Sequence, residues 1–183
     1  MLLFAVLLIV ILLTGIVRGR ERLTALADLP VCHLWLAPAA LALQLPLMRA
    51  PAASTASELL VPRLAFGASY VLLGCALWAN RRLPGVPWLA AGVFLNGLVI
   101  MANGGWMPIA PGTVMALDDS SWLVGAHHGA FKDVVLFPSV THLWFLSDIF
   151  VIPRPFPWPT AFSIGDILIV TGVARFACPK GRA

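Results

Sequence analysis

Residues 86–102, VPWLAAGVFLNGLVIMA, decide the predicted fold, because they run for seventeen residues without a charged side chain. A helix of this length approaches the ~30 Å hydrocarbon core of a bilayer. Four other stretches are similarly apolar: residues 1–17, 31–48, 58–80 and 162–178. The sequence therefore predicts an all-α integral membrane protein, a bundle of about five transmembrane helices forming a single domain over residues 1–183.

The overall composition favours the same class. Hydrophobic residues make up 60% of the chain and charged residues 11%, and the mean hydropathy is +0.93. Soluble domains carry about 25% charged residues, so too little polar surface remains here to cover a water-exposed fold. The net charge of +4 does not indicate a nucleic-acid partner, because that would need basic residues gathered on one face. The expected partner is the lipid bilayer.

The basic residues predict an orientation in the cell membrane. Arg18, Arg20 and Arg22 follow the first apolar stretch, whereas a cleaved signal peptide carries its positive charge in front. Lys and Arg gather on the cytoplasmic side of membrane proteins, and eight of the twelve fall on one side of the predicted bundle. This pattern predicts a multi-pass protein with its amino terminus outside and its carboxyl terminus in the cytoplasm.

The connection at residues 103–161 is too long and too rich in tryptophan to be a disordered loop. Within it, residues 134–152 are apolar enough for a sixth span, but they contain His142 and Asp148, which are costly in lipid. We expect a structured outer segment, with residues 134–152 forming an amphipathic or re-entrant piece. A sixth span remains the alternative.

A polar stripe follows residues 86–102. Gly92, Asn96 and Asn103 recur at helical spacing, and the turn Asn103-Gly104-Gly105 ends the stretch. One interpretation is close helix packing, with Asn96 hydrogen-bonded to a neighbouring helix. The other is a ligand site where the bare glycine backbone approaches a bound group. Both remain open.

The last apolar stretch opens with Ser163 and Asp166, the spacing of a capping box. In this interpretation Ser163 accepts from the Asp166 amide and Asp166 reaches back. The alternative is a functional carboxylate that binds a cation or a proton. We expect residues 103–108 to meet residues 163–166 where the two helices end and begin.

No other pattern in the sequence names a catalytic residue, a metal ligand set or a cofactor. His127 and His128 are adjacent and would diverge on a helix, and no chelating spacing joins them to Asp118, Asp119 or Asp133. Cys32, Cys75 and Cys178 are interpreted as packing residues.

Three runs carry a resemblance: LNGLVIMANGGWMP at residues 95–108, HLWFLSDIF at 142–150 and FSIGDILI at 162–169. They resemble an uncharacterised family of small bacterial multi-pass membrane proteins of unknown function, most specifically through the Asn-Gly-Gly-x-Met-Pro element. The resemblance implies a bacterial cytoplasmic membrane location and no particular reaction or ligand.

The leading functional hypothesis is a non-enzymatic protein that binds an ion or small ligand at one end of the bundle. Its candidate ligand-binding residues are Asn96, Asn103, Gly104, Gly105, Asp148 and Asp166. An accessory subunit of a larger membrane complex, or a homo-oligomer, is the alternative, with Gly67 and Gly74 on a contact face. A membrane-embedded enzyme is a third hypothesis, although no nucleophile and base can be paired from spacing.

Overall fold

A computed structural model describes residues 30–33, 35–48, 60–117, 123–125, 127–128, 133–157 and 159–177. The predicted helix at residues 1–17 and the arginines after it lie outside the described residues. The same holds for Asp118, Asp119 and Cys178, and for the side chains of His127 and His128.

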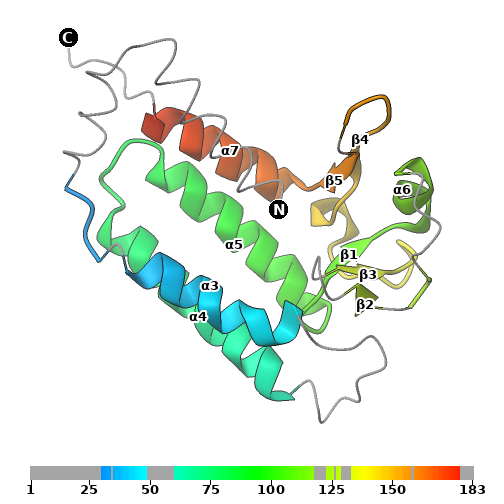
Figure 1. Ribbon diagram of the computed structural model, residues 1–183, viewed down its shortest axis with the longest axis horizontal. Helices are drawn as coiled ribbons and strands as arrows, with labels where there is room; N and C mark the ends of the chain where they lie inside the picture. Colours follow the sequence, from blue (N-terminus) through cyan, green and yellow to red (C-terminus); the bar gives the residue numbers. More distant parts are fainter. Residues whose placement is uncertain are drawn as a thin grey trace.

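In the described part of the chain the four longest helices form one part of the molecule: α3 (Leu36–Met48), α4 (Leu60–Ala79), α5 (Val86–Ala102) and α7 (Ile164–Ala177). Helix α5 lies between α7 on one side and α4 on the other, and α3 packs on α4 (Figure 1). Helix α5 begins after Gly85, whose φ of 84° suits glycine, with Pro87 in its first turn.

The chain between α5 and α7 forms a second part, which we call the sheet region. It contains β1 (Met107–Ile109), α6 (Pro111–Ala116), β2 (His127–His128), β3 (Asp133–Val135), the 3-10 turn η2 (Trp144–Leu146), β4 (Phe150–Ile152) and β5 (Thr160–Phe162). One sheet has the order β1-β3-β2, with β1 parallel and β2 antiparallel to β3. The other pairs β4 with β5 antiparallel. The sheet region lies where α5 ends and α7 begins (Figure 1).

The main hydrophobic core joins the two parts. Phe66 of α4 and Val99 of α5 are fully buried against Trp106 and Leu146 of the sheet region. A smaller cluster of Ile109, Val114 and Val135 lies inside the sheet region itself. The sheet region is therefore packed onto the helices through side chains.

The predicted all-α bundle is wrong, because the described residues include five strands in two sheets. None of the described helices combines the length and the apolar character needed to cross a membrane. Helices of 13, 17 and 14 residues, α3, α5 and α7, reach only about 20–26 Å at 1.5 Å per residue. This finding contradicts the predicted multi-pass assignment to the cell membrane and the orientation built on it.

The four longest described helices lie within four of the stretches that the sequence shows to be apolar. The stretch at residues 86–102 is α5 itself, and the stretches at 31–48, 58–80 and 162–178 contain α3, α4 and α7. The prediction of an amphipathic or re-entrant piece at residues 134–152 is wrong, and so is the alternative of a sixth span. These residues contain most of β3, a turn, η2 and β4. Their apolar side chains Val134 and Leu146 pack in the main core together with side chains of β1 and α5.

Candidate functional site

Glycines bring α5 and α7 into backbone contact. A Cβ on Gly92 would overlap with the Gly165 carbonyl oxygen, and a Cβ on Gly165 would overlap with the Asn96 amide oxygen. Only glycine permits this approach. It places the Asn96 side chain directly beside the first turn of α7.

The first turn of α7 is a capping box. The Asp166 amide donates to Ser163 Oγ at 3.1 Å, and the Ser163 amide donates to Asp166 Oδ2 at 3.0 Å. Ser163 is fully buried. The capping interpretation of these two residues is thus confirmed.

Asn96 extends the capping box across to α5. Its Nδ2 donates to Asp166 Oδ1 at 2.9 Å, and its Oδ1 lies 2.9 Å from the Ser163 hydroxyl, which can donate to it. The same hydroxyl lies 3.1 Å from Asp166 Oδ2. Since a hydroxyl has one proton, Ser163 donates to one of the two oxygens at a time. These contacts confirm the predicted hydrogen bond from Asn96 to a neighbouring helix and the close helix packing at Gly92.

Asp148 approaches Asp166 from the sheet region. Its amide donates to the Pro108 carbonyl at 3.2 Å, which fixes its backbone beside β1. The residue is 9% exposed. Its Oδ1 is buried and has no hydrogen-bond partner among the residues that the structure describes. Burial, and then the negative charge of Asp166, raise the pKa of Asp148 from 3.8 to about 8.

Tyr70 completes the group from α4. Its ring lies where a Cβ on Gly97 would be, so a glycine in α5 makes room for it. Burial, and then the charge of Asp166, raise the pKa of Tyr70 from 10.0 to about 12. We call Tyr70, Asn96, Asp148, Ser163 and Asp166 the polar cluster. Three helices and the sheet region contribute to it.

Asn103, Gly104 and Gly105 have other neighbours. Asn103 donates to the carbonyls of Val99 at 2.7 Å and His142 at 2.9 Å, and accepts from the His142 amide at 3.0 Å. The two glycines have φ of 74° and 94° and lie against the Arg63 side chain. The partner of Asp166 on α5 is therefore Asn96. Residues 103–108 and 163–166 share the main core instead, where Ile164 packs against the cluster that contains Trp106 and Met107.

Sequence reasoning named Asn96, Asp148 and Asp166 but missed Tyr70. The available signal was that Tyr70 is the one tyrosine of the chain and stands in an otherwise apolar stretch. Spacing along the chain could not have placed it beside Asp166, because the two residues are 96 positions apart.

The chemistry of the polar cluster is that of oxygen ligands. No group of three His, Cys, Asp or Glu side chains gathers in the part of the chain that the structure describes. Two carboxylates, an amide, a hydroxyl and a phenol could hold a proton or a hard cation, which prefers oxygen donors. A soft metal finds no thiolate among these groups.

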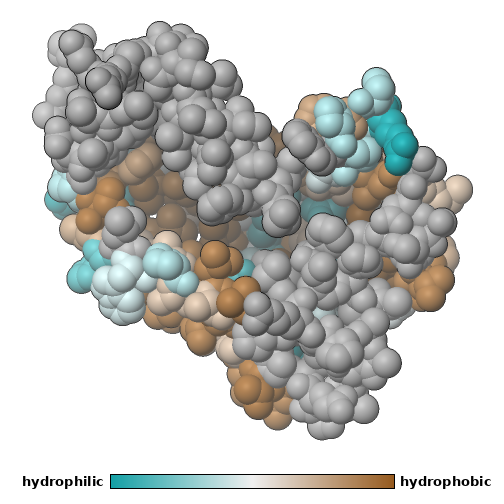
Figure 2. Space-filling model, viewed as in Figure 1, coloured by the Kyte–Doolittle hydropathy of each residue, from teal (hydrophilic) through white to brown (hydrophobic). Residues whose placement is uncertain are grey.

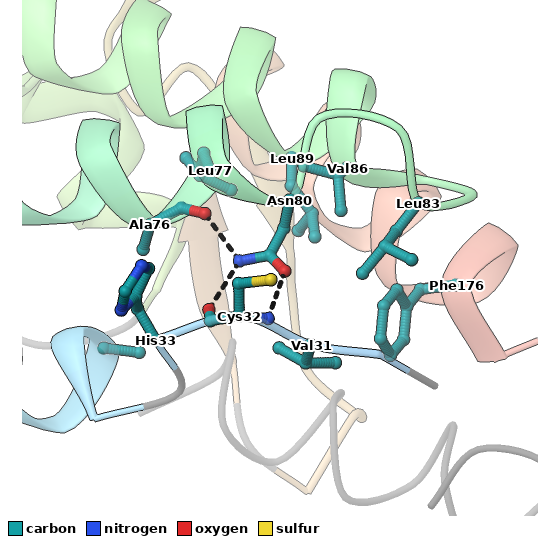
Figure 3. A pocket seen from close by; sticks show the side chains of 11 residues that line it. Val31, Cys32, His33, Ala76, Leu77, Asn80, Leu83, Val86, Leu89 and Phe176 are labelled. Carbon is teal, nitrogen blue, oxygen red and sulfur yellow. Dashed lines mark hydrogen bonds between the residues drawn. The ribbon is translucent and has the colours of Figure 1, made fainter. Parts of the chain in front are cut away.

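A separate cavity of about 160 Å³ lies at the opposite end of the helices (Figure 3). Its wall is almost entirely apolar and includes Leu83, Leu89 and Phe176. The Asn80 amide holds Cys32 there, accepting from its amide at 2.8 Å and donating to its carbonyl at 2.9 Å. A third bond, to the Ala76 carbonyl, uses the second N–H of Asn80. With both donors engaged and the wall apolar, this cavity offers little polar chemistry.

The geometry thus defines a small protein with a helical layer, a sheet region at one end and a buried oxygen-rich cluster between them. The chain belongs to the family of unknown function DUF5317, which matches residues 28–178. An uncharacterized protein of Thermotoga maritima is 35% identical over 127 residues. The match covers 68% of this chain and 66% of that protein, just under two thirds of the relative's length. No solved structure matches the chain.

The comparisons confirm the resemblance to an uncharacterised family. They do not support a membrane location for the family, or a special place in it for the Asn-Gly-Gly-x-Met-Pro element.

Proposed function

We propose that this protein binds a small, hard cation at the polar cluster, between the carboxylates of Asp148 and Asp166. The observation that carries the proposal is the buried Asp148 Oδ1, which has no hydrogen-bond partner in the described part of the chain. A buried carboxylate without partners is costly when charged. A bound cation would remove that cost.

The other groups of the cluster suit the same occupant. Asp166 already accepts from Asn96 and Ser163, but a carboxylate has about four acceptor positions. The Asn96 amide oxygen and the Ser163 hydroxyl can turn lone pairs toward a cation. Hard cations such as Na⁺, Mg²⁺ and Ca²⁺ take oxygen ligands of these types.

The proton is the competing occupant. Because burial and Asp166 raise the pKa of Asp148 to about 8, its carboxyl group is protonated at neutral pH in the absence of a cation. A cation must displace this proton. Its affinity should therefore rise with pH until the pH passes about 8.

Thermal unfolding of the full chain tests the proposal. At pH 8.5 and constant ionic strength, one of Na⁺, K⁺, Mg²⁺, Ca²⁺ or Mn²⁺ should raise the melting temperature. A ligand at a hundred times its Kd adds about 2.7 kcal/mol of stability. Asp148→Asn and Asp166→Asn should each abolish the response.

Asp133→Asn is the control, because Asp133 lies in β3 and outside the polar cluster. It should keep the cation response whatever its own effect on stability. If none of the five cations raised the melting temperature of the wild-type protein, the proposal would be refuted and the proton would be left as the occupant.

A further inference from the structure

Helix α4 presents a row of apolar side chains to its outer side. They are Val61, Leu64, Ala68, Val71, Cys75 and Trp78, which we call the outer stripe. All six are exposed, with Val61 at 71% and Trp78 at 69%. Hydrophobic residues are visible over the helical part in Figure 2, where Figure 1 places α3 and α4.

The spacing of the outer stripe is that of a coiled coil. Its members are three, four, three, four and three residues apart, so they occupy the a and d positions of nearly three heptads. None of them is charged. The inner side of the same helix carries Phe66 and Ser69, which are fully buried in this chain. An exposed apolar row of this length marks an interaction surface, and its period fits another α-helix.

We propose that the outer stripe binds the outer stripe of a second copy of this chain, with the two α4 helices antiparallel about a twofold axis. The sizes of the side chains at the a and d positions are the reason for proposing a second copy as the partner. The a positions hold Val61, Ala68 and Cys75, and the d positions hold Leu64, Val71 and Trp78. In the antiparallel register centred between Ala68 and Val71, every a position faces a d position of the other copy.

Each layer then pairs a smaller side chain with a larger one. Val61 faces Trp78, Leu64 faces Cys75 and Ala68 faces Val71, and the twofold axis repeats each pair. Facing positions that alternate large and small fill a helix interface without voids. A surface that is complementary to itself in this way is what an isologous dimer requires.

Helix α5 widens the surface. Met101 is 53% exposed, and its Cε lies 3.2 Å from the place of a Cβ on Gly67 of α4, so the two helices adjoin there. Phe94 and Leu98, also exposed, continue the apolar row along α5. A stable interface buries about 800 Å² on each partner, and the exposed side chains of α5 add to the surface of the outer stripe. The dimer would be a four-helix arrangement of two α4 and two α5.

A disulfide experiment tests the register independently of the cation proposal. In the full chain with Cys32→Ser and Cys178→Ser, Cys75 is the remaining cysteine. The antiparallel register separates the two Cys75 residues by eleven helical positions, about 16 Å, too far for a disulfide. Adding Leu64→Cys places a thiol opposite Cys75 of the other copy.

The oxidation is carried out under mild conditions in a non-ionic detergent, which suppresses nonspecific hydrophobic association. The Leu64→Cys chain should then form a disulfide-linked dimer of twice 19.6 kDa. It should do so at least tenfold faster than the parent with Cys75 alone. Equal rates, with the parent cross-linking readily, would indicate a parallel pair and overturn the proposal. So would the absence of cross-linking in both chains.

A charge at the axis tests the association without a disulfide. Ala68→Glu brings two carboxylates close together in the dimer and should raise its dissociation constant at least tenfold, measured by sedimentation in the same detergent. Met115→Glu is the matched control, because Met115 is 80% exposed on α6, outside the outer stripe. A wild-type chain that sediments as a monomer at all concentrations would refute the dimer.

Discussion

Asp148 holds a carboxyl group where water hardly reaches and where Asp166 already carries a negative charge. Its backbone is held beside Pro108 by the hydrogen bond from its amide. The group escapes the cost of burial by keeping its proton, which is why its pKa rises to about 8. The residue therefore makes the stability of the protein depend on pH.

The direction of this dependence follows from proton linkage. The pKa of Asp148 is about 8 in the folded chain and 3.8 as its ordinary value, so the folded state binds more protons between these two values. Its contribution to stability is complete below about pH 4 and is lost as the pH rises through about 8. We expect Asp148→Asn, measured by denaturant unfolding from pH 4 to 9 without added cations, to remove most of this decline. If the stability of the variant declined with pH as much as that of the wild type, a group other than Asp148 would cause the decline.

Gly165 tests the close approach of α5 and α7. A Cβ there would overlap with the Asn96 amide oxygen, so Gly165→Ala should lower the free energy of unfolding by about 1–3 kcal/mol, as overpacking does. Gly74→Ala is the control, because no atom lies within 4 Å of its Cβ position and alanine favours a helix by up to about 1 kcal/mol. Equal effects of the two substitutions in urea unfolding would contradict the close approach.

At the scale of elements, the sequence predicted what depends on near neighbours. The capping box needs only Ser163 and Asp166, three residues apart, and α5 follows from one uninterrupted apolar stretch. The strands could not be predicted in this way. Strand β1 pairs with β3 through Met107 and Asp133, residues 26 positions apart in three-residue strands too short to show a period.

The junction between α5 and the sheet region depends on Asn103. Its amide makes both hydrogen bonds to the His142 backbone as well as one to Val99. Asn103→Ala should lower the free energy of unfolding by about 1–3 kcal/mol, because the backbone carbonyl and amide of His142 lose their hydrogen-bond partners. Hydrogen exchange should become faster at residues 140–143 and stay unchanged in α7.

Asn80→Ala provides the matched control for this junction. Asn80 holds the backbone of Cys32 with the same pair of amide bonds at the other end of the helices. Removal of the Asn80 side chain should make amide hydrogen exchange faster near Cys32 and leave exchange at residues 140–143 unchanged. Faster exchange throughout the chain in the Asn103 variant would mean that global unfolding, and not the junction, had been weakened.

At the scale of the whole molecule, composition misled the prediction because it counts apolar residues without saying where they lie. The outer sides of α4 and α5 expose Leu64, Val71 and Phe94, while other apolar side chains form the core between the helices and the sheet region. The same composition fits long spans or short helices with apolar outer faces. Asp148 and Asp166 were named as candidates for one site, but the position of Tyr70 beside Asp166, 96 residues away along the chain, was beyond any local pattern.

The polar cluster links the sheet region to α7 through charge, and this link can be measured. Asp166→Asn removes the negative charge that helps to raise the pKa of Asp148, while an amide oxygen can still accept from the Ser163 amide. We therefore expect the decline of stability with pH to move to lower pH in this variant. Burial would still hold the pKa of Asp148 above 3.8, because burial is the larger cause of its shift.

Ser163→Ala separates this electrostatic link from the cap. It removes the hydroxyl that accepts from the Asp166 amide but leaves both carboxyl groups in place. Loss of an N-cap costs about 0.5–2 kcal/mol. Stability should therefore fall at every pH by a similar amount, with the midpoint of the decline unmoved. If both variants moved the midpoint equally, disruption of the α7 cap would explain the shift. The charge of Asp166 would then have no part in holding the proton on Asp148.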